Sequence, residues 1–198
     1  MYRDPNFFSE VVEMIEIRLH GRGGQGVVAS GEMIALAAVY EGKYCRAFPF
    51  YGSARRGSPV VAFAQIGEMD EATRCYVYTP DIVLILDPGI PKAVDVTTGL
   101  KSDGVIVWNT TLSPEEALKE LGVEVSKIGV VDATTIALES FGRPIPNTAL
   151  LGAFIKTTSL LKLESIEKAI RKRFPGEIAE KNIVAARRGY EEVRVYER

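Results

Sequence analysis

The sequence contains few of the residues that carry metal and redox chemistry. It has two cysteines, Cys45 and Cys75, and one histidine, His20, in 198 residues. The cysteines lie outside any CxxC pattern, and a four-iron cluster needs about four thiolates. A zinc site built from one histidine and two distant cysteines is not expected either. We therefore expect reduced thiols, a cytoplasmic location and no metal in this chain.

Long apolar runs and an excess of positive charge are also missing. No run reaches the roughly 18–20 uncharged apolar residues of a membrane-spanning helix. Residues 1–13 contain Asp4 and Glu10 and no small-residue cleavage site, so they do not resemble a secretory signal. A formal net charge of −2 provides no basic footprint for nucleic acid and no polybasic patch. We therefore expect neither a nucleic acid nor a membrane as partner.

Motifs of self-sufficient enzymes are absent as well. The sequence has no GxSxG, no HExxH, no Walker loop with GK[ST] and no GDG…NN pattern of a thiamine-diphosphate site. The chain is therefore expected to provide a binding site, with the redox chemistry carried elsewhere.

The hydrophobic pattern predicts alternating strands and helices. Strands are expected at residues 15–19, 44–48, 59–66, 81–86, 104–108 and 128–131, and helices at 25–40, 90–98, 113–121 and 134–141. Ser113, Pro114 and Glu116 form the signature of a capping box. Residues 148–161, 163–174 and 177–193 are expected to be helical, with no strand after Phe141.

This pattern predicts an α/β fold. We expect a three-layer α/β/α domain at residues 14–198, with a mostly parallel Rossmann-like sheet and C-terminal helices that pack back on it. Residues 1–13 form an N-terminal extension.

A glycine-rich loop joins the first strand to the first helix. Residues 21–26 read GRGGQG and fit GxGxxG. In this position the glycines permit a tight turn, close approach of a ligand and close helix–strand packing. Unpaired N–H groups at the start of a helix favour an anion such as phosphate, and Arg22 adds positive charge. A tight turn without a ligand is the alternative, although four glycines in six residues exceed what a turn needs.

An NAD(P) site is the first interpretation of such a loop, but one feature is missing. The second strand should end in an acid, about 20 residues beyond the loop, to bind the ribose hydroxyls. Residues 43–52 contain no acid, although Arg46 would suit a 2′-phosphate. A different phosphate-bearing ligand fits at least as well.

A second candidate region follows the second strand. The segment FPFYGSARRGSP (residues 48–59) contains Tyr51 directly before Gly52, and Arg55 and Arg56 directly before Gly57. Adjacent arginines pair with phosphates or carboxylates, and aromatic rings stack on a ligand or fill a partner's pocket. Ligand binding and subunit contact are equally expected for this segment, and a solvated surface loop is less expected.

Four other residues have mainly structural interpretations. We expect His20 to be a half-buried histidine with its hydrogen bonds satisfied, and Cys45 to be a buried structural thiol. Asp87 and Asp132 each follow an apolar strand. Either residue lines the crevice or caps the next segment, and capping is favoured for Asp132.

Four segments together resemble a known family. They read IEIRLHGRGGQGVVASGEMIA, KYCRAFPFYGSARRGSPVVAFAQIG, PDIVLILDP and VVDATTIALESFGRPIPNTALLGAF. They are similar to the gamma subunits of 2-oxoacid:ferredoxin oxidoreductases, above all of the pyruvate type (pyruvate synthase), including those shared with the 2-oxoisovalerate enzyme. The combination of HGRGGQG with FPFYGxxRRGxP is much more specific than GxGxxG alone.

The resemblance implies a place in a larger enzyme. Such enzymes oxidatively decarboxylate a 2-oxoacid to acyl-CoA and reduce ferredoxin. Thiamine diphosphate with magnesium and the iron–sulfur clusters would belong to the alpha, beta and delta partner subunits only. This chain would help to bind coenzyme A and would hold no catalytic residue. The implied binding or interface residues are Gly21, Arg22, Gly23, Gly24, Gln25, Gly26, Tyr51, Gly52, Arg55, Arg56, Asn147 and Thr148.

Two rival functions remain open at this point. One is a stand-alone NAD(P)-binding oxidoreductase, against which the missing acid argues. The other is a purely structural assembly subunit, in which the arginine segment contacts a neighbour and no ligand binds.

Overall fold

A short apolar strand lies at the centre of the fold. Ile82 and Leu84 of β4 (Ile82–Ile85) belong to one buried apolar cluster, whereas Val83 and Ile85 belong to another. All four are at most 5% exposed. A strand that is buried on both faces requires helices on both faces of its sheet.

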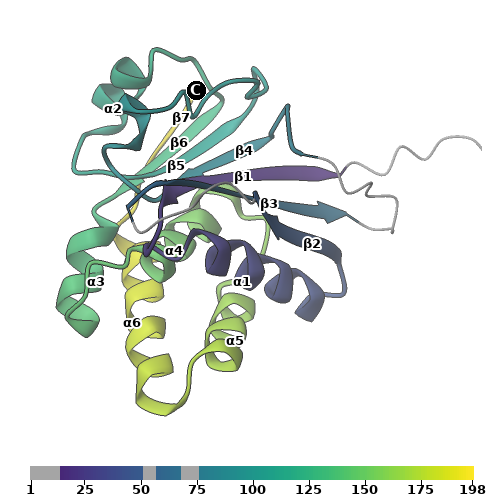
Figure 1. The fold of residues 1–198 in the computed structure, drawn as a ribbon, viewed down its shortest axis with the longest axis vertical. Helices are drawn as coiled ribbons and strands as arrows, with labels where there is room; N and C mark the ends of the chain where they lie inside the picture. The colour runs from purple at the N-terminus through teal and green to yellow at the C-terminus, as the bar shows by residue number, and fades with distance from the viewer. Residues whose placement is uncertain (1–13, 51–56, 68–75) are drawn as a thin grey trace, which may run out of the picture.

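The computed structural model describes residues 14–50, 57–67 and 76–198, and within these ranges the strands form one seven-stranded sheet (Figure 1). Its order is β2-β3-β1-β4-β5-β6-β7. The parallel centre consists of β1 (Ile15–Arg22), β4, β5 (Val105–Asn109) and β6 (Lys127–Val131). Outside it, β2 (Tyr44–Pro49) runs in the same direction, and β3 (Pro59–Gly67) and β7 (Arg194–Glu197) run against it. The predicted, mostly parallel α/β fold is confirmed.

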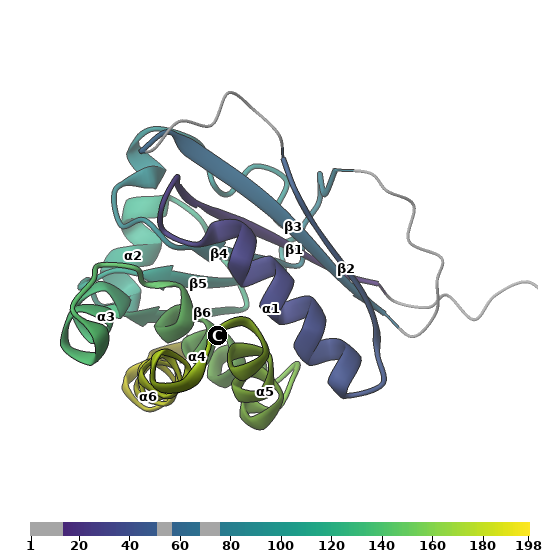
Figure 2. The ribbon, with the colours of Figure 1, turned by 60° about the horizontal axis from the view of Figure 1, so that its bottom comes forward.

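The helices are distributed unequally over the two faces (Figures 1 and 2). One face carries α1 (Val27–Tyr40) over β1, β2 and β3, and α4 (Asn147–Thr158) over β5 and β6. Three further helices pack against these two: α3 (Ala133–Phe141), α5 (Leu163–Arg173) and α6 (Gly176–Glu192). The other face has α2 (Pro114–Leu121) and the 3-10 turn η1 (Ile90–Lys92). The expected C-terminal helices therefore form a thick layer on one side of the sheet.

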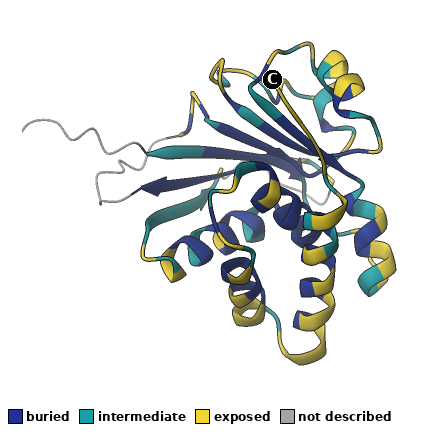
Figure 3. Ribbon diagram, turned by 180° about the vertical axis from the view of Figure 1, so that it is seen from behind, coloured by how far each residue is buried: buried dark blue, intermediate teal, exposed yellow. Residues whose placement is uncertain are grey.

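Helix α4 is the buried centre of that layer. Ten of its twelve residues are buried, because the sheet lies on one side of it and α6 on the other. Figure 3 shows the complementary pattern, with dark blue along the strands and yellow on the outer faces of the surrounding helices. The apolar stripes of α5 and α6 thus face α4 and α1.

Two predictions about individual elements are wrong, and one is confirmed in detail. The helix expected at residues 90–98 is limited to η1, because the Asp95 carboxylate accepts hydrogen bonds from Thr97 and Thr98 and stabilises a turn instead. The strand β7 was not expected, since its four exposed residues have no apolar face and gain order by pairing with β6. The capping box of α2 is present, with Ser113 and Glu116 bonding each other's backbone N–H groups.

No helix within the described ranges is both long and apolar enough to cross a membrane.

Candidate functional site

The carboxyl ends of the parallel strands meet at one edge of the sheet. The glycine loop (residues 21–26) follows there from β1 into α1, and Asp87 follows β4. Ligands of open α/β sheets bind in the crevice outside these strand ends. The sequence-predicted loop therefore lies where this architecture places binding sites.

The glycines of this loop have distinct physical roles. Gly24 and Gly26 have φ angles of +102° and +82°, a region that side chains strongly disfavour. At Gly26 a Cβ atom would also lie 2.5 Å from the Asn147 side-chain nitrogen. Close helix–strand packing occurs at Gly21, where a Cβ would lie 2.7 Å from the Val27 side chain. The helix–strand packing expected of these glycines therefore depends on Gly21, the first of them.

Helix α1 begins with backbone donors that have no partner among the described residues. Its first intrahelical bond joins the Ser30 N–H to the Gly26 carbonyl at 2.8 Å, which leaves the N–H groups of Val27, Val28 and Ala29 without an intrahelical acceptor. No side chain of the described residues caps this turn, and none of its first-turn residues is acidic. These donors and the positive end of the helix dipole favour an anion.

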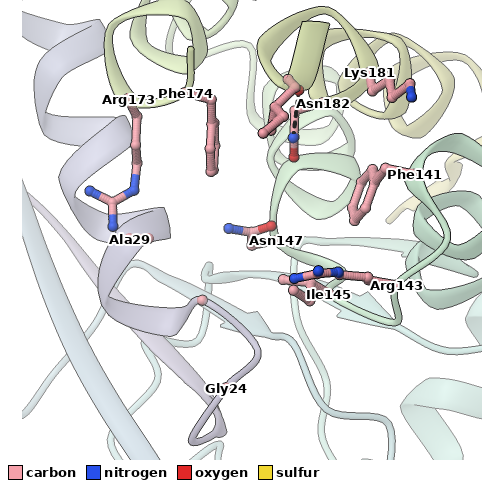
Figure 4. A pocket seen from close by; sticks show the side chains of 12 residues that line it. Gly24, Ala29, Phe141, Arg143, Ile145, Asn147, Arg173, Phe174, Lys181 and Asn182 are labelled. Carbon is pink, nitrogen blue, oxygen red and sulfur yellow. Dashed lines mark hydrogen bonds between the residues drawn. The ribbon is translucent and has the colours of Figure 1, made fainter.

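A cavity of about 500 Å³ opens beside this helix start (Figure 4). Its walls come from three segments: the glycine loop with the start of α1, the connection from α3 to α4, and the connection from α5 to α6. Phe141, Ile145, Phe174 and Ile178 contribute apolar surface. Mostly apolar pockets of this size with a few polar groups are typical of small-molecule sites.

A second cavity of about 530 Å³ adjoins the first. Both are lined by Gly24, Gly26, Ala29 and Arg173, so the start of α1 lies at their junction. The two cavities therefore lie on either side of the glycine loop's exit into α1.

Three cationic side chains line the first cavity, and two of them form ion pairs with described residues. Arg173 is paired with Glu32 at 3.0 Å, and Lys181 with Glu177 at 2.7 Å. Arg143 is exposed, and its guanidinium forms neither an ion pair nor a hydrogen bond with any described residue. Arg143 is therefore the best-placed cation for an anionic ligand. Sequence reasoning missed it, although it stands four residues before the predicted Asn147.

Asn147 and Thr148 differ in their surroundings. The side-chain Oδ1 of Asn147 accepts from the Thr148 N–H at 2.9 Å, which directs the side-chain nitrogen away from this bond and toward the start of α1 (Figure 4). Thr148 is completely buried, and its hydroxyl donates to Asn182. The structure therefore brings Asn147 to the cavity, while Thr148 joins α4 to α6.

Arg22 and Gln25 are engaged within the loop. Arg22 Nε donates to Asp87 at 3.1 Å, and Gln25 Nε2 donates to the same carboxylate at 2.7 Å. Arg22 also donates to the Gly57 carbonyl. These bonds hold the loop in shape and occupy the polar groups that we had expected to meet a ligand.

Most of the arginine segment lies outside the described residues. Tyr51, Gly52, Arg55 and Arg56 are among the residues that the structure does not describe. The two residues that follow are anchored on the glycine loop. The Gly57 N–H donates to the Gly23 carbonyl at 3.1 Å, and the Gly23 N–H donates to the Ser58 carbonyl at 3.0 Å. The two sequence-predicted regions are therefore joined at residue 57.

The residues with mainly structural interpretations have mixed outcomes. Asp132 caps α3 by accepting from the Thr135 N–H, as predicted. Burial raises the pKa of the Cys45 thiol to about 12, which keeps it protonated at neutral pH. The prediction of a satisfied His20 is wrong, because both ring nitrogens are buried and without a hydrogen-bond partner among the described residues.

The strand order also bears on the NAD(P) interpretation. That site needs the second strand of the chain to lie parallel and directly beside β1, with the ribose-binding residue at its carboxyl end. Here β3 lies between β1 and β2, and it runs the other way. Arg46 lies within β2 at the sheet edge, where it donates to the Tyr44 hydroxyl at 2.8 Å. The expected arrangement of a dinucleotide site is therefore not formed by these strands.

The fold and this site define an α/β protein in which the uncapped start of a helix lies beside a mostly apolar cavity. The chain belongs to the pyruvate ferredoxin/flavodoxin oxidoreductase family, whose model matches residues 16–192, and it is of the gamma-subunit type within 2-oxoacid:ferredoxin oxidoreductase complexes. It is 52% identical over 184 residues to the pyruvate/ketoisovalerate oxidoreductases common subunit gamma of Pyrococcus abyssi, a match that covers 93% of this chain and 100% of that protein.

Solved structures agree with this assignment. The pyruvate oxidoreductase subunit PORC of Thermotoga maritima is 46% identical, with a TM-score of 0.81 over 93% of this chain and 99% of that one. The 2-oxoglutarate:ferredoxin oxidoreductase of Magnetococcus marinus, solved with 2-oxoglutarate, coenzyme A and succinyl-CoA bound, matches 90% of this chain and 30% of its own. At 19% identity and a TM-score of 0.71, that likeness concerns the fold alone.

Proposed function

We propose that this gamma subunit binds the nucleotide end of coenzyme A for its oxidoreductase complex. The start of α1, whose first three N–H groups have no partner among the described residues, lies where two cavities meet, and Arg143 lines one of them without a charged partner in the described ranges; this observation carries the proposal. Coenzyme A has a diphosphate and a 3′-phosphate, which match a helix N-terminus and an arginine. The apolar walls suit the adenine ring. The coenzyme A bound in the Magnetococcus marinus enzyme supports this choice of ligand.

The role is one of positioning. The glycine loop and Arg143 would fix the nucleotide, and the thiol end would be left to the subunits that carry the redox chemistry. Thiamine diphosphate, magnesium and the iron–sulfur clusters would be held by alpha, beta and delta subunits, with ferredoxin as the electron acceptor of the complex in the cytoplasm. This chain would have no catalytic residue of its own.

Substitution of Arg143 in the assembled complex tests the proposal. Because a hydrogen bond to a charged group contributes about 1.5–3 kcal/mol, Arg143→Ala should raise the KM for coenzyme A roughly tenfold or more. The KM for the 2-oxoacid should not change. Asn147→Ala should raise the same KM by a smaller factor, since it removes a neutral donor.

Arg171→Ala is the matched control. Arg171 is also an exposed arginine of the C-terminal helices, but it is paired with Glu180 outside the cavity. Its loss should leave the KM for coenzyme A unaltered. An Arg143 variant with the same coenzyme A dependence as the parent complex would rule out the proposed site.

A further inference from the structure

Asp87 lies behind the glycine loop, at the carboxyl end of the central strand. The strands β4 and β1 are parallel neighbours, and the Leu86 N–H donates to the His20 carbonyl at 2.8 Å. This pairing sets the next residue, Asp87, beside the loop that leaves β1. The Asp87 side chain is 14% exposed and lines neither of the two cavities.

Three donors converge on the Asp87 carboxylate. One oxygen accepts from Arg22 Nε at 3.1 Å and from the Gly89 N–H at 3.1 Å. The other accepts from Gln25 Nε2 at 2.7 Å. Because all three partners are donors, the side chain at position 87 must only accept hydrogen bonds, as an ionised carboxylate does.

Gln25 closes this network onto the backbone. Its Oε1 atom accepts from the Arg22 N–H at 2.7 Å, so the amide cannot turn over without losing that bond. Its NH₂ group is therefore directed at Asp87. Two side chains of the loop, Arg22 and Gln25, therefore bind the same carboxylate. Helix α1 begins two residues after Gln25, and its first N–H groups have no partner among the described residues.

We infer that Asp87 is the positioning residue that holds the glycine loop in its ligand-binding shape. The inference rests on the proposed coenzyme A site and adds the group that orders it. Asp87 acts through Arg22 and Gln25, without touching the ligand itself. Charged hydrogen bonds of this kind are among the stronger ones in a fold, so one carboxylate is enough to restrain the loop.

The chain contains a matched control in Asp81. This residue precedes the same strand, at the opposite end of β4, and accepts from the Glu16 N–H at 2.7 Å and from Lys101. Asp81→Asn removes a structural carboxylate of similar kind far from the loop. Asp87→Asn places an amide donor against Arg22 or Gln25.

The assembled complex provides the first readout. Asp87→Asn should raise the KM for coenzyme A about tenfold, with a much smaller change in kcat and none in the KM for the 2-oxoacid. Asp87→Glu, which keeps an acceptor-only group, should recover most of this loss. Asp81→Asn should not change the KM for coenzyme A, even if it lowers stability.

Amide hydrogen exchange on the full chain provides a second readout that does not depend on coenzyme A. Asp87→Asn should accelerate exchange at the hydrogen-bonded amides of Arg22, Gly23 and Gln25, and Asp81→Asn should not. Unaltered exchange in the Asp87 variant overturns the inference. Faster exchange with an unchanged KM, while Arg143→Ala raises it, overturns the positioning role alone. An unchanged KM in both variants overturns the proposed coenzyme A site, and the inference with it.

Discussion

His20 is buried by its strand without hydrogen bonds to its imidazole ring, and this burial costs free energy. It is 5% exposed, it lies beside Ile85 of β4, and neither ring nitrogen has a hydrogen-bond partner among the described residues. Burial, together with the nearby Arg18, lowers its pKa from 6.5 to about 3. The imidazole is therefore neutral in the folded chain at neutral pH.

The depressed pKa of His20 predicts a loss of stability in mild acid. The unfolded chain takes up a proton near pH 6.5 and the folded chain only near pH 3. Stability is therefore full above the unfolded pKa and falls as the pH decreases between these values. The contribution amounts to about 2 kcal/mol between pH 7 and pH 5.

Replacement by a neutral side chain measures this contribution. Between pH 7 and pH 5 the unfolding free energy of the parent chain should fall by about 2 kcal/mol more than that of His20→Leu, as measured by urea titrations. Identical pH dependence of the two proteins would show that folding does not lower the pKa of His20.

At the scale of residues, the sequence predicted the place of the glycine loop, which joins β1 to α1 in the structure. The loop GRGGQG has few other uses between a strand and a helix, so its position could be predicted. Arg143 and Phe174 could not be predicted in the same way. Each stands in a connection between helices, and only the packing of α3, α5 and α6 around α4 brings them to the start of α1.

At the scale of elements, two helices cross at glycines. Gly152 of α4 and Gly189 of α6 are both buried, and a Cβ atom on either would overlap the backbone of the other helix, at Ala186 or Ala149. Their backbones are therefore in direct contact. This crossing fixes the angle at which α6 passes the cavity and carries Ile178, Lys181 and Asn182 to it.

A pair of glycine substitutions tests the importance of this crossing. Gly152→Ala should destabilise the chain by about 3 kcal/mol, because neither backbone can yield without moving a helix. Gly31→Ala is the control: Gly31 is also buried within a helix, α1, but its Cβ would lie 3.7 Å from the nearest atoms. That change should be neutral or add up to about 1 kcal/mol of stability.

Thermal or urea unfolding of the two variants decides the matter. Equal stabilities of Gly152→Ala and Gly31→Ala would mean that the α4–α6 contact adjusts freely.

At this scale most elements could be predicted, because strands of 4–9 residues and amphipathic helices have distinct periods. The two failures were of another kind. The turn at Asp95 depends on side-chain hydrogen bonds that compete with a helix, and β7 exists only because β6 offers it an edge. Neither effect produces a hydrophobic period.

At the scale of the whole molecule, a cluster of aromatic side chains is exposed, as is common where a protein contacts another subunit. Phe50, Tyr76 and Tyr78 are 45%, 48% and 71% exposed, and their rings are in contact beside the edge strand β2. Clustered apolar surface of this kind marks interaction sites. We propose that another subunit of the oxidoreductase covers it.

This view of the molecule predicts that the chain is inactive alone. The purified chain should not oxidise pyruvate with an artificial electron acceptor, whereas the complex with its partner subunits should. Partner subunits mixed without this chain are the control, and they should show a weaker dependence on coenzyme A. Turnover by the chain alone would refute the division of roles that we propose.

The sequence by itself determined the α/β class, the order of most elements and the glycine loop, because these depend on local periodicity and on backbone conformations that only glycine adopts readily. The tertiary structure alone decided what surrounds the loop. In it β3 lies between β1 and β2, Arg22 and Gln25 donate hydrogen bonds to Asp87, and Arg143 lines the cavity. These contacts join residues far apart in the chain, and long-range packing of this kind leaves no periodic signal along it.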